Sequence, residues 1–157
     1  MNYLLWIFLL LILNGCNQQA VTQDSAIVID TLKEEAAIKS VLTEMWDAIE
    51  KNDIDRYAKY VHPDFTQFGE NDSTLLVGKS NEVSSIKNWM EDASNVHTEM
   101  IDPKITIKGN VAWITYYWSD AGMNDGKLFS SRGKSTRIFI KENNQWLCIH
   151  GHYTLLP

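Results

Sequence analysis

The clearest hydrophobic period in the chain lies between residues 31 and 51, where apolar side chains recur at the spacing of one helix face. The residues of this face are Ile38, Val41, Leu42, Met45, Trp46 and Ile49. The helix is expected to begin near Thr31, because Thr31 and Glu34 have the spacing of a capping box. A second, short helix is predicted from Ile54 to Val61, and Pro63 stops it because the residue before a proline avoids the α region.

Beyond Pro63 the pattern changes to extended segments that are separated by turn residues. Two short strands, 65–68 and 74–77, precede a helix that Gly78 opens. Four longer strands are then predicted, the first of them bent at Asp102-Pro103, over residues 96–108, 111–118, 129–141 and 145–155. Helices that precede a run of antiparallel strands indicate an α+β fold with the helices packed on one face of the sheet.

Both alternating faces of the predicted strand 111–118 are apolar or aromatic, with the sequence Val-Ala-Trp-Ile-Thr-Tyr-Tyr-Trp. A sheet with one face in water would show polar residues at every second position. The far face therefore needs a cover, and a second copy of the same sheet is the simplest one. We expect a homodimer that forms through the sheet.

The first residues of the chain resemble a bacterial lipoprotein signal. The ten apolar residues from Leu4 to Leu13 are too few for a membrane-spanning helix, which needs about 20, and they fit a secretory signal peptide. The sequence Asn14-Gly15-Cys16 follows, and with Leu13 it resembles a lipobox, which implies a lipid anchor on Cys16. The alternatives are a secretory signal with an incidental Cys16 and a short buried helix.

These features divide the chain into three predicted parts. Residues 1–15 form a signal peptide, residues 16–30 hold the lipidated Cys16 and a flexible tether, and residues 31–157 form one folded domain. The expected location is the bacterial cell envelope, at the outer membrane where the cell has one, and otherwise the protein is secreted. Contact with a membrane is expected through the lipid anchor only.

Composition and charge narrow the classes of function. Twenty Asp and Glu against fourteen Lys and Arg give a net charge of −6, which argues against nucleic acid as a partner. The 45% hydrophobic content argues against a disordered chain, and two Cys are too few for a disulfide framework. No nucleophile elbow or phosphate-binding loop occurs, and we expect no cofactor.

Several segments together resemble the nuclear transport factor 2-like superfamily, in particular its SnoaL-like and DUF4440-type members. They are Met45–Tyr57 and Val61–Phe65 in the first two helices, Ile107–Trp113 in the central hairpin, and Thr136–Phe139 and Trp146–His152 in the last two strands. The resemblance implies a cone-shaped α+β half-barrel. In such a domain a curved, mostly antiparallel sheet wraps around a long N-terminal helix and leaves a pocket at the open end.

The superfamily contains isomerases, dehydratases, polyketide cyclases and binding domains without catalytic activity, so the fold does not decide the function.

The last two strands are also similar to the association domain of calcium/calmodulin-dependent protein kinase II, in which several arginines line the pocket. One of these falls on Arg137, whereas two others fall near Trp118 and Tyr153. The resemblance therefore implies an aromatic-lined pocket in which Arg137 can hold an anionic group. A structural ion pair of Arg137 across the sheet is the alternative.

His150 and His152 form the strongest local group for chemistry. On a regular strand they share one face with Trp146 and Cys148, because residues two apart point the same way. Three interpretations are open: a structural role for both histidines, acid–base catalysis near neutral pH, or a metal site with Cys148 or Glu99 as the third ligand. Cys148 is either a small buried hydrophobe or a thiol nucleophile beside His150.

The sequence thus predicts a domain that binds a small, partly apolar ligand in its cone pocket. The expected ligand-binding residues are Trp46, Tyr57, Phe68, Trp89, Tyr116, Trp118, Arg137, His150 and His152. One alternative is a cofactor-free isomerase, cyclase or dehydratase that uses His150 or His152 as its acid–base group, and another is a structural dimerisation module. The carboxylates considered for a pocket base are Asp64, Glu99, Asp102 and Asp120.

Overall fold

The computed structural model describes residues 18–70 and 72–157, and the chain divides into two compact units, Met1–Lys33 and Glu34–Pro157. The predicted signal peptide and Cys16 lie outside the described residues. Helix α1 spans Gln18–Glu50. It begins earlier than predicted, so residues 18–30 are helical where a flexible tether was expected. The sequence between Asn17 and Thr31 contains no Gly or Pro, so no helix breaker separates this segment from the predicted helix.

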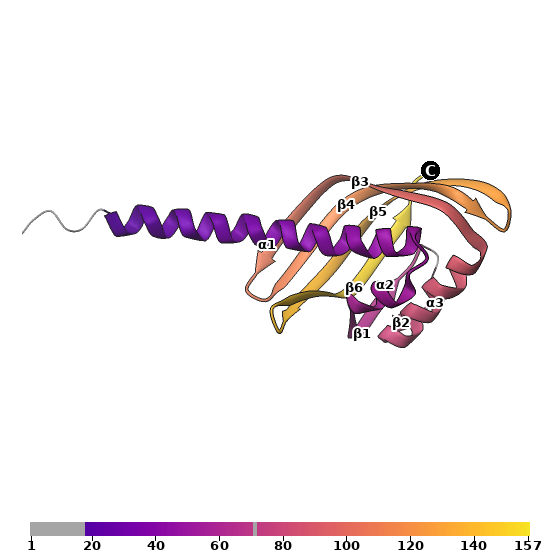
Figure 1. Ribbon diagram of the computed structural model, residues 1–157, viewed down its shortest axis with the longest axis horizontal. Helices are drawn as coiled ribbons and strands as arrows, with labels where there is room; N and C mark the ends of the chain where they lie inside the picture. Colours follow the sequence, from indigo (N-terminus) through magenta and orange to yellow (C-terminus); the bar gives the residue numbers. More distant parts are fainter. Residues whose placement is uncertain (1–17, 71) are drawn as a thin grey trace, which may run out of the picture. The chain divides into compact units, whose positions relative to one another are not determined.

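The remaining elements follow the predicted order and make an α+β fold. Their bounds are α2 Ile54–Lys59, β1 Val61–Phe68, β2 Leu76–Val77, α3 Lys79–Asp92, β3 Ala93–Lys108, β4 Val111–Asn124, β5 Lys127–Glu142 and β6 Gln145–Leu155. The strands form one sheet in the order β2-β1-β6-β5-β4-β3 (Figure 1). Neighbouring strands are antiparallel except for β1 and β6, which are parallel. None of the described helices has both the length and the hydropathy that a membrane span requires.

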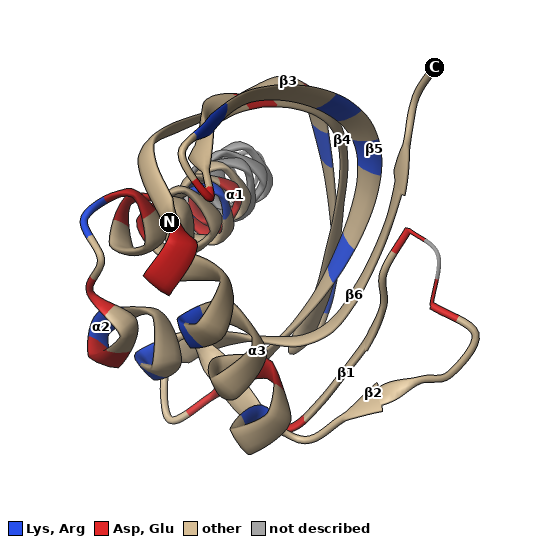
Figure 2. Ribbon diagram, turned by 90° about the vertical axis from the view of Figure 1, so that its right-hand side faces the viewer, with Lys and Arg blue, Asp and Glu red and all other residues tan. Residues whose placement is uncertain are grey.

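The sheet is curved, and in the unit Glu34–Pro157 it bends around the helices (Figure 2). The inner face, called the concave face below, carries the core. The fully buried members of this core are Ile38, Leu42 and Ala48 from α1, Val61 and Phe65 from β1, Ala112 and Ile114 from β4, Phe139 from β5 and Cys148 from β6. The predicted apolar face of the first helix thus packs against alternate residues of the strands.

Glu34 ties this part of α1 to the sheet. Its carboxylate accepts hydrogen bonds from Lys141 Nζ and from Trp146 Nε1, each at 2.6 Å. Trp146 is buried, and an indole N–H in that position needs an acceptor. The contact fixes which part of α1 lies over β5 and β6.

Two of the register shifts in the sheet bear on the site. The register of β3 against β4 shifts between Ile101 and Lys104, where Asp102-Pro103 was expected to cause a bend. The register of β6 against β5 shifts as well, because Ile138 pairs with His150 while Phe139 pairs with Cys148. Ile149 is therefore an extra residue in β6, and such a bulge reverses the alternation of faces beyond it.

Candidate functional site

Four polar side chains gather on the concave face: Tyr57, Gln67, Glu82 and Arg137. Tyr57 is held by α2, and Glu82 lies on the face of α3 that also carries the buried Met90. The Tyr57 hydroxyl donates a hydrogen bond of 2.6 Å to Glu82 Oε1. Only 1% of the Glu82 surface is exposed to solvent. A carboxylate is thus held in the interior by a neutral donor.

The second carboxylate oxygen of Glu82 has no partner. Oε2 is buried and accepts no hydrogen bond from any described residue. The pKa of Tyr57 is well above its usual value because the hydroxyl is buried and because the Glu82 charge lies beside it. Tyr57 therefore stays protonated at neutral pH and occupies Oε1, which leaves Oε2 as the free acceptor of the pair.

Arg137 approaches the same region from β5. Its Nη1 donates a hydrogen bond of 2.7 Å to Gln67 Oε1, whereas its Nε is buried without a partner. Burial alone would lower the pKa of Arg137, but the surrounding acidic groups outweigh burial and raise this pKa. These groups are Tyr116, Cys148, Tyr57 and Glu82. Arg137 is therefore a permanent cation, and it forms no salt bridge with a described residue.

A glycine leaves the space that Arg137 needs. A Cβ on Gly151 would collide with the Arg137 guanidinium, and it would lie 2.7 Å from Gln67 Oε1. Gly151 therefore faces the concave side, together with the arginine with which it pairs across β5 and β6. The absence of a side chain permits this close approach.

Aromatic rings continue the concave face beside the polar group. Tyr116 is buried and meets Trp46 edge-on, with ring centroids 5.6 Å apart. Trp118 meets Tyr153 in the same way at 6.3 Å, and both of these rings are partly exposed. Solvent therefore reaches the aromatic part of this face.

The bulge at Ile149 moves His150 and His152 to the outer face, so the prediction that they share a face with Trp146 and Cys148 is wrong. His150 Nδ1 lies 2.8 Å from the Thr66 hydroxyl. The Phe68 ring lies 6.5 Å from the His150 ring and 6.0 Å from the His152 ring. The sequence-based prediction assumes that successive residues of a regular strand alternate between the two faces. A bulge adds a residue that this alternation does not reveal.

The predicted ligand-binding residues therefore divide between the two faces. The concave side holds Trp46, Tyr57, Tyr116, Trp118 and Arg137, whereas the outer face holds Phe68, His150 and His152. Trp89, on α3, packs edge-on against Phe129 at 6.2 Å.

Cys148 lies on the face opposite to both histidines, so it cannot complete a metal site with them. Burial raises the pKa of its thiol to about 11, and Cys148 therefore has the properties of a buried hydrophobe. Within residues 18–70 and 72–157 no group of three or more His, Cys, Asp and Glu is placed to hold a metal ion.

The fully buried carboxylate on the concave side, Glu82, was not among the predicted ones. Asp64, Glu99 and Asp102 are exposed. Asp120 is partly buried on the concave side, and burial raises its pKa. Glu82 was missed, although its position gives a signal: it stands four and eight residues before Ile86 and Met90, on the apolar stripe of α3.

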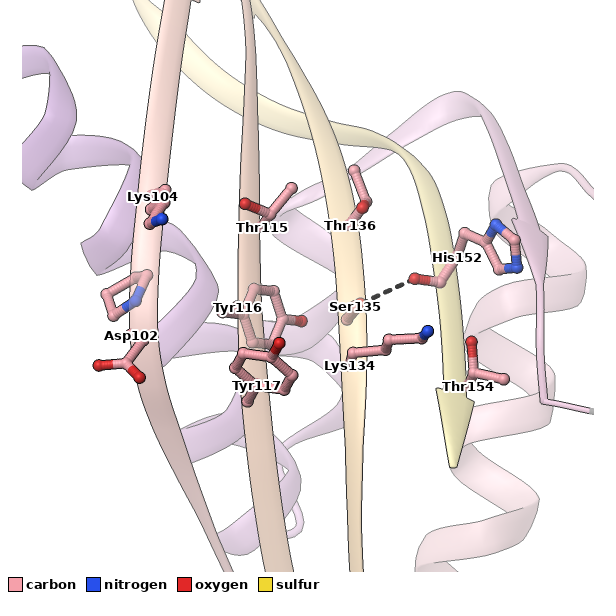
Figure 3. Close-up of a pocket in the computed structure, with 11 residues that line it drawn as sticks. Asp102, Lys104, Thr115, Tyr116, Tyr117, Lys134, Ser135, Thr136, His152 and Thr154 are labelled. Carbon is pink, nitrogen blue, oxygen red and sulfur yellow. Dashed lines mark hydrogen bonds between the residues drawn. The ribbon is translucent and has the colours of Figure 1, made fainter. Parts of the chain in front are cut away.

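An open groove of about 770 Å³ crosses the outer face of β3 to β6. Figure 3 shows Lys104, Thr115 and Thr136 on three neighbouring strands of this groove. The lining also includes Asp102, Pro103, Tyr116, Tyr117, Lys134, Ser135, His152 and Thr154. The groove is thus polar and basic over part of its length, with the Tyr117 ring beside it.

Comparison with known proteins gives the family. Residues 38–156 match the SnoaL-like domain, and the chain belongs to this family. The predicted DUF4440-type subdivision stays a prediction.

Solved structures agree on the fold. The chain is similar to a proposed dehydratase of the NTF2-like family from Streptomyces avermitilis, with a TM-score of 0.73 and 14% identity over 80% of this chain and 97% of that chain. It is also similar to an NTF2-like protein with a cystatin-like fold from Novosphingobium aromaticivorans, with a TM-score of 0.72 and 13% identity over 90% of this chain and 92% of that chain. For the association domain of CaMKII from C. elegans the TM-score is 0.64 and the identity 22%, over 78% of this chain and 95% of that chain. At these identities the likeness shows the fold, and the predicted fold class is confirmed.

We expect His150 to make stability depend on pH. Burial lowers its pKa below the usual 6.5, and the neighbouring His152 and Arg137 act in the same direction. Between the lowered pKa and 6.5 the unfolded chain binds more protons than the folded one, so stability falls as the pH falls through this window.

Thermal melting of the wild type and of His150→Gln between about pH 7.5 and 5.5 measures this effect. The wild type should lose more stability than the variant, because glutamine does not titrate. His97→Gln, a change of an exposed histidine, is the control and should follow the wild type. An equal loss in the wild type and His150→Gln would contradict the assignment.

Proposed function

We propose that this SnoaL-like domain binds a small, partly apolar molecule on the concave side of its sheet, with the anionic end of the ligand at Arg137. The observation that carries the proposal is the buried Nε of Arg137, which has no partner among the described residues, while Nη1 of the same guanidinium donates to Gln67. A buried donor without an acceptor is costly, and a carboxylate would satisfy it with charge-assisted hydrogen bonds.

The apolar part of the ligand would lie against the partly exposed rings of Trp118 and Tyr153. These rings and Arg137 lie on one face, because Trp118 pairs with Gly133 while Tyr153 pairs with Ser135, four and two residues from Arg137 on β5. Aromatic rings offer a large apolar surface for a ligand that carries its own ring.

The acid–base alternative has less geometric support. It relied on His150 and His152 in the cone pocket, and both lie on the outer face of the sheet, opposite to the Arg137 side chain. The structural alternative, a dimerisation module, concerns a different face of the domain and is compatible with ligand binding on the concave side.

Binding of 3-phenylpropionate tests the proposal, because this probe combines an aryl ring with one carboxylate. Calorimetric titration of the wild type should show binding, and Arg137→Gln should weaken it about 10- to 100-fold, the value of a charge-assisted pair. Arg137→Lys should lose part of the affinity because a lysine offers no fork of donors.

Arg132→Gln is the matched control. Arg132 lies on the same strand but contacts the Pro157 carbonyl, so its loss should leave the affinity unchanged. Equal affinities of wild type and Arg137→Gln, with both folded by circular dichroism, would refute the role of Arg137.

We also propose that a second copy of the chain covers the outer face. Tyr117 and Trp113 on β4 are 49% and 36% exposed there, Ile101 is exposed on the neighbouring β3, and Phe68 is exposed on β1. Large apolar residues that gather on one face of a soluble domain indicate a partner surface.

Light scattering after size-exclusion chromatography measures the oligomeric state. The wild type should have the mass of a dimer and Tyr117→Lys that of a monomer, because a lysine would be buried at the contact without a partner. Leu128→Lys, at the 86% exposed Leu128 near the end of the β4–β5 hairpin, should remain dimeric. A monomeric wild type at every concentration would exclude this interface.

Anchoring of the domain to the bacterial envelope through Cys16 is likewise proposed, on the lipobox-like sequence Leu13-Asn14-Gly15-Cys16. In a bacterial host the wild type should sediment with membranes, and Cys16→Ser should move to the soluble fraction because it lacks the acceptor of the lipid. Recovery of both proteins in the soluble fraction would contradict the anchor.

A further inference from the structure

We propose that the ligand is a zwitterion of the amino-acid type, whose carboxylate contacts Arg137 and whose ammonium group contacts Glu82. The inference rests on the proposed binding function and adds a second recognition element to it. Glu82 supplies the negative group that a purely anionic ligand would not need.

Glu82 lacks the partners that a buried carboxylate requires. Its Oε1 accepts the Tyr57 hydroxyl, while Oε2 is buried and unpaired, and no described Lys, Arg or His forms a salt bridge with it. A buried carboxylate with one neutral donor has lost most of its hydration without full compensation. An ammonium group of a ligand would supply both the charge and the donor.

Arg137 and Glu82 are close enough to affect each other but do not neutralise each other by contact. The Glu82 charge is among the causes that raise the pKa of Arg137, yet the two side chains form no ion pair within 4 Å. Two opposite charges that stay apart present a dipole to whatever lies between them. A zwitterion in the matching orientation satisfies both ends.

The same arrangement selects against simpler ligands. A carboxylate bound at Arg137 is repelled by Glu82, and an amine bound at Glu82 is repelled by Arg137, because screening is weak away from water. Only a ligand that brings both charges avoids both penalties. Trp118 and Tyr153 lie on the same face, which favours an amino acid with an aromatic side chain.

Three probes of nearly equal size separate the contributions: L-phenylalanine carries both charges, 3-phenylpropionate the anion alone, and phenethylamine the cation alone. Calorimetric titration of the full chain should give the tightest binding for L-phenylalanine, at least about 10-fold tighter than for either of the others. Wild-type binding of 3-phenylpropionate as tight as that of L-phenylalanine would overturn the inference.

Glu82→Gln tests the residue itself. The amide keeps the size of the side chain and can still accept from Tyr57, but it removes the charge. The preference for L-phenylalanine over 3-phenylpropionate should disappear, and 3-phenylpropionate should bind more tightly than to the wild type because the repulsion is gone. Glu91→Gln, an exposed change on the same helix, should keep the wild-type ranking. An unchanged preference in folded Glu82→Gln would overturn the role of Glu82.

If Glu82→Gln does not fold, Tyr57→Phe replaces it. This variant frees Oε1 and leaves the Glu82 charge in place, so the preference for L-phenylalanine should persist. Loss of the preference would count against the charge as its cause.

The proposed function and the zwitterion inference fail on different results. Binding of 3-phenylpropionate through Arg137 without any gain from the ammonium group leaves the proposed function standing and refutes the zwitterion. No binding of any probe at millimolar concentration refutes both for this class of ligand.

Discussion

The extra residue at Ile149 in β6 decides what surrounds the Arg137 guanidinium. Beyond the bulge, Gly151 and Tyr153 face the helices while the two histidines face outward. A regular strand would place His150 beside Arg137, where an imidazole would occupy the space that the guanidinium now fills. The glycine thus gives Arg137 its position, and the position gives the concave face its positive end.

The arrangement of charge on that face is unfavourable for stability by itself. Glu82 is buried and Arg137 is partly buried, and each keeps a buried polar atom without a partner. Apolar residues of similar volume would fill the same space at lower cost. Buried polar atoms without partners often mark positions that serve something other than folding, and here both groups lie on the face that the aromatic residues border.

The sequence predicted the elements well where local signals exist. The last strand, Gln145–Leu155, has the bounds that the turn residues before it suggested, and the bend at Asp102-Pro103 appears as a shift of register. The start of α1 at Gln18 was missed because the capping box at Thr31 lies inside a segment that nothing interrupts. The faces of His150 and His152 were wrong because a bulge depends on pairing with β5, which alternation within one strand does not encode. Glu82 was missed because a single acidic residue on a helix is exposed in most proteins.

The two faces of the sheet impose different requirements on the same strands. On β4, Tyr116 must fit among the buried residues around Trp46, while its neighbour Tyr117 stands in solvent on the other side. On β5, Arg137 belongs to the concave face, and Thr136 and Ile138 on either side of it belong to the outer one. The inward-facing residues of a strand can therefore be substituted to suit another ligand without disturbing the outer surface. The outward-facing residues can likewise be substituted without disturbing the concave face. That separation explains why a likeness in fold at 13% to 22% identity leaves the ligand undetermined: the curvature is set by bulges and core residues, whereas recognition depends on the few inward side chains at the level of Arg137 and Glu82.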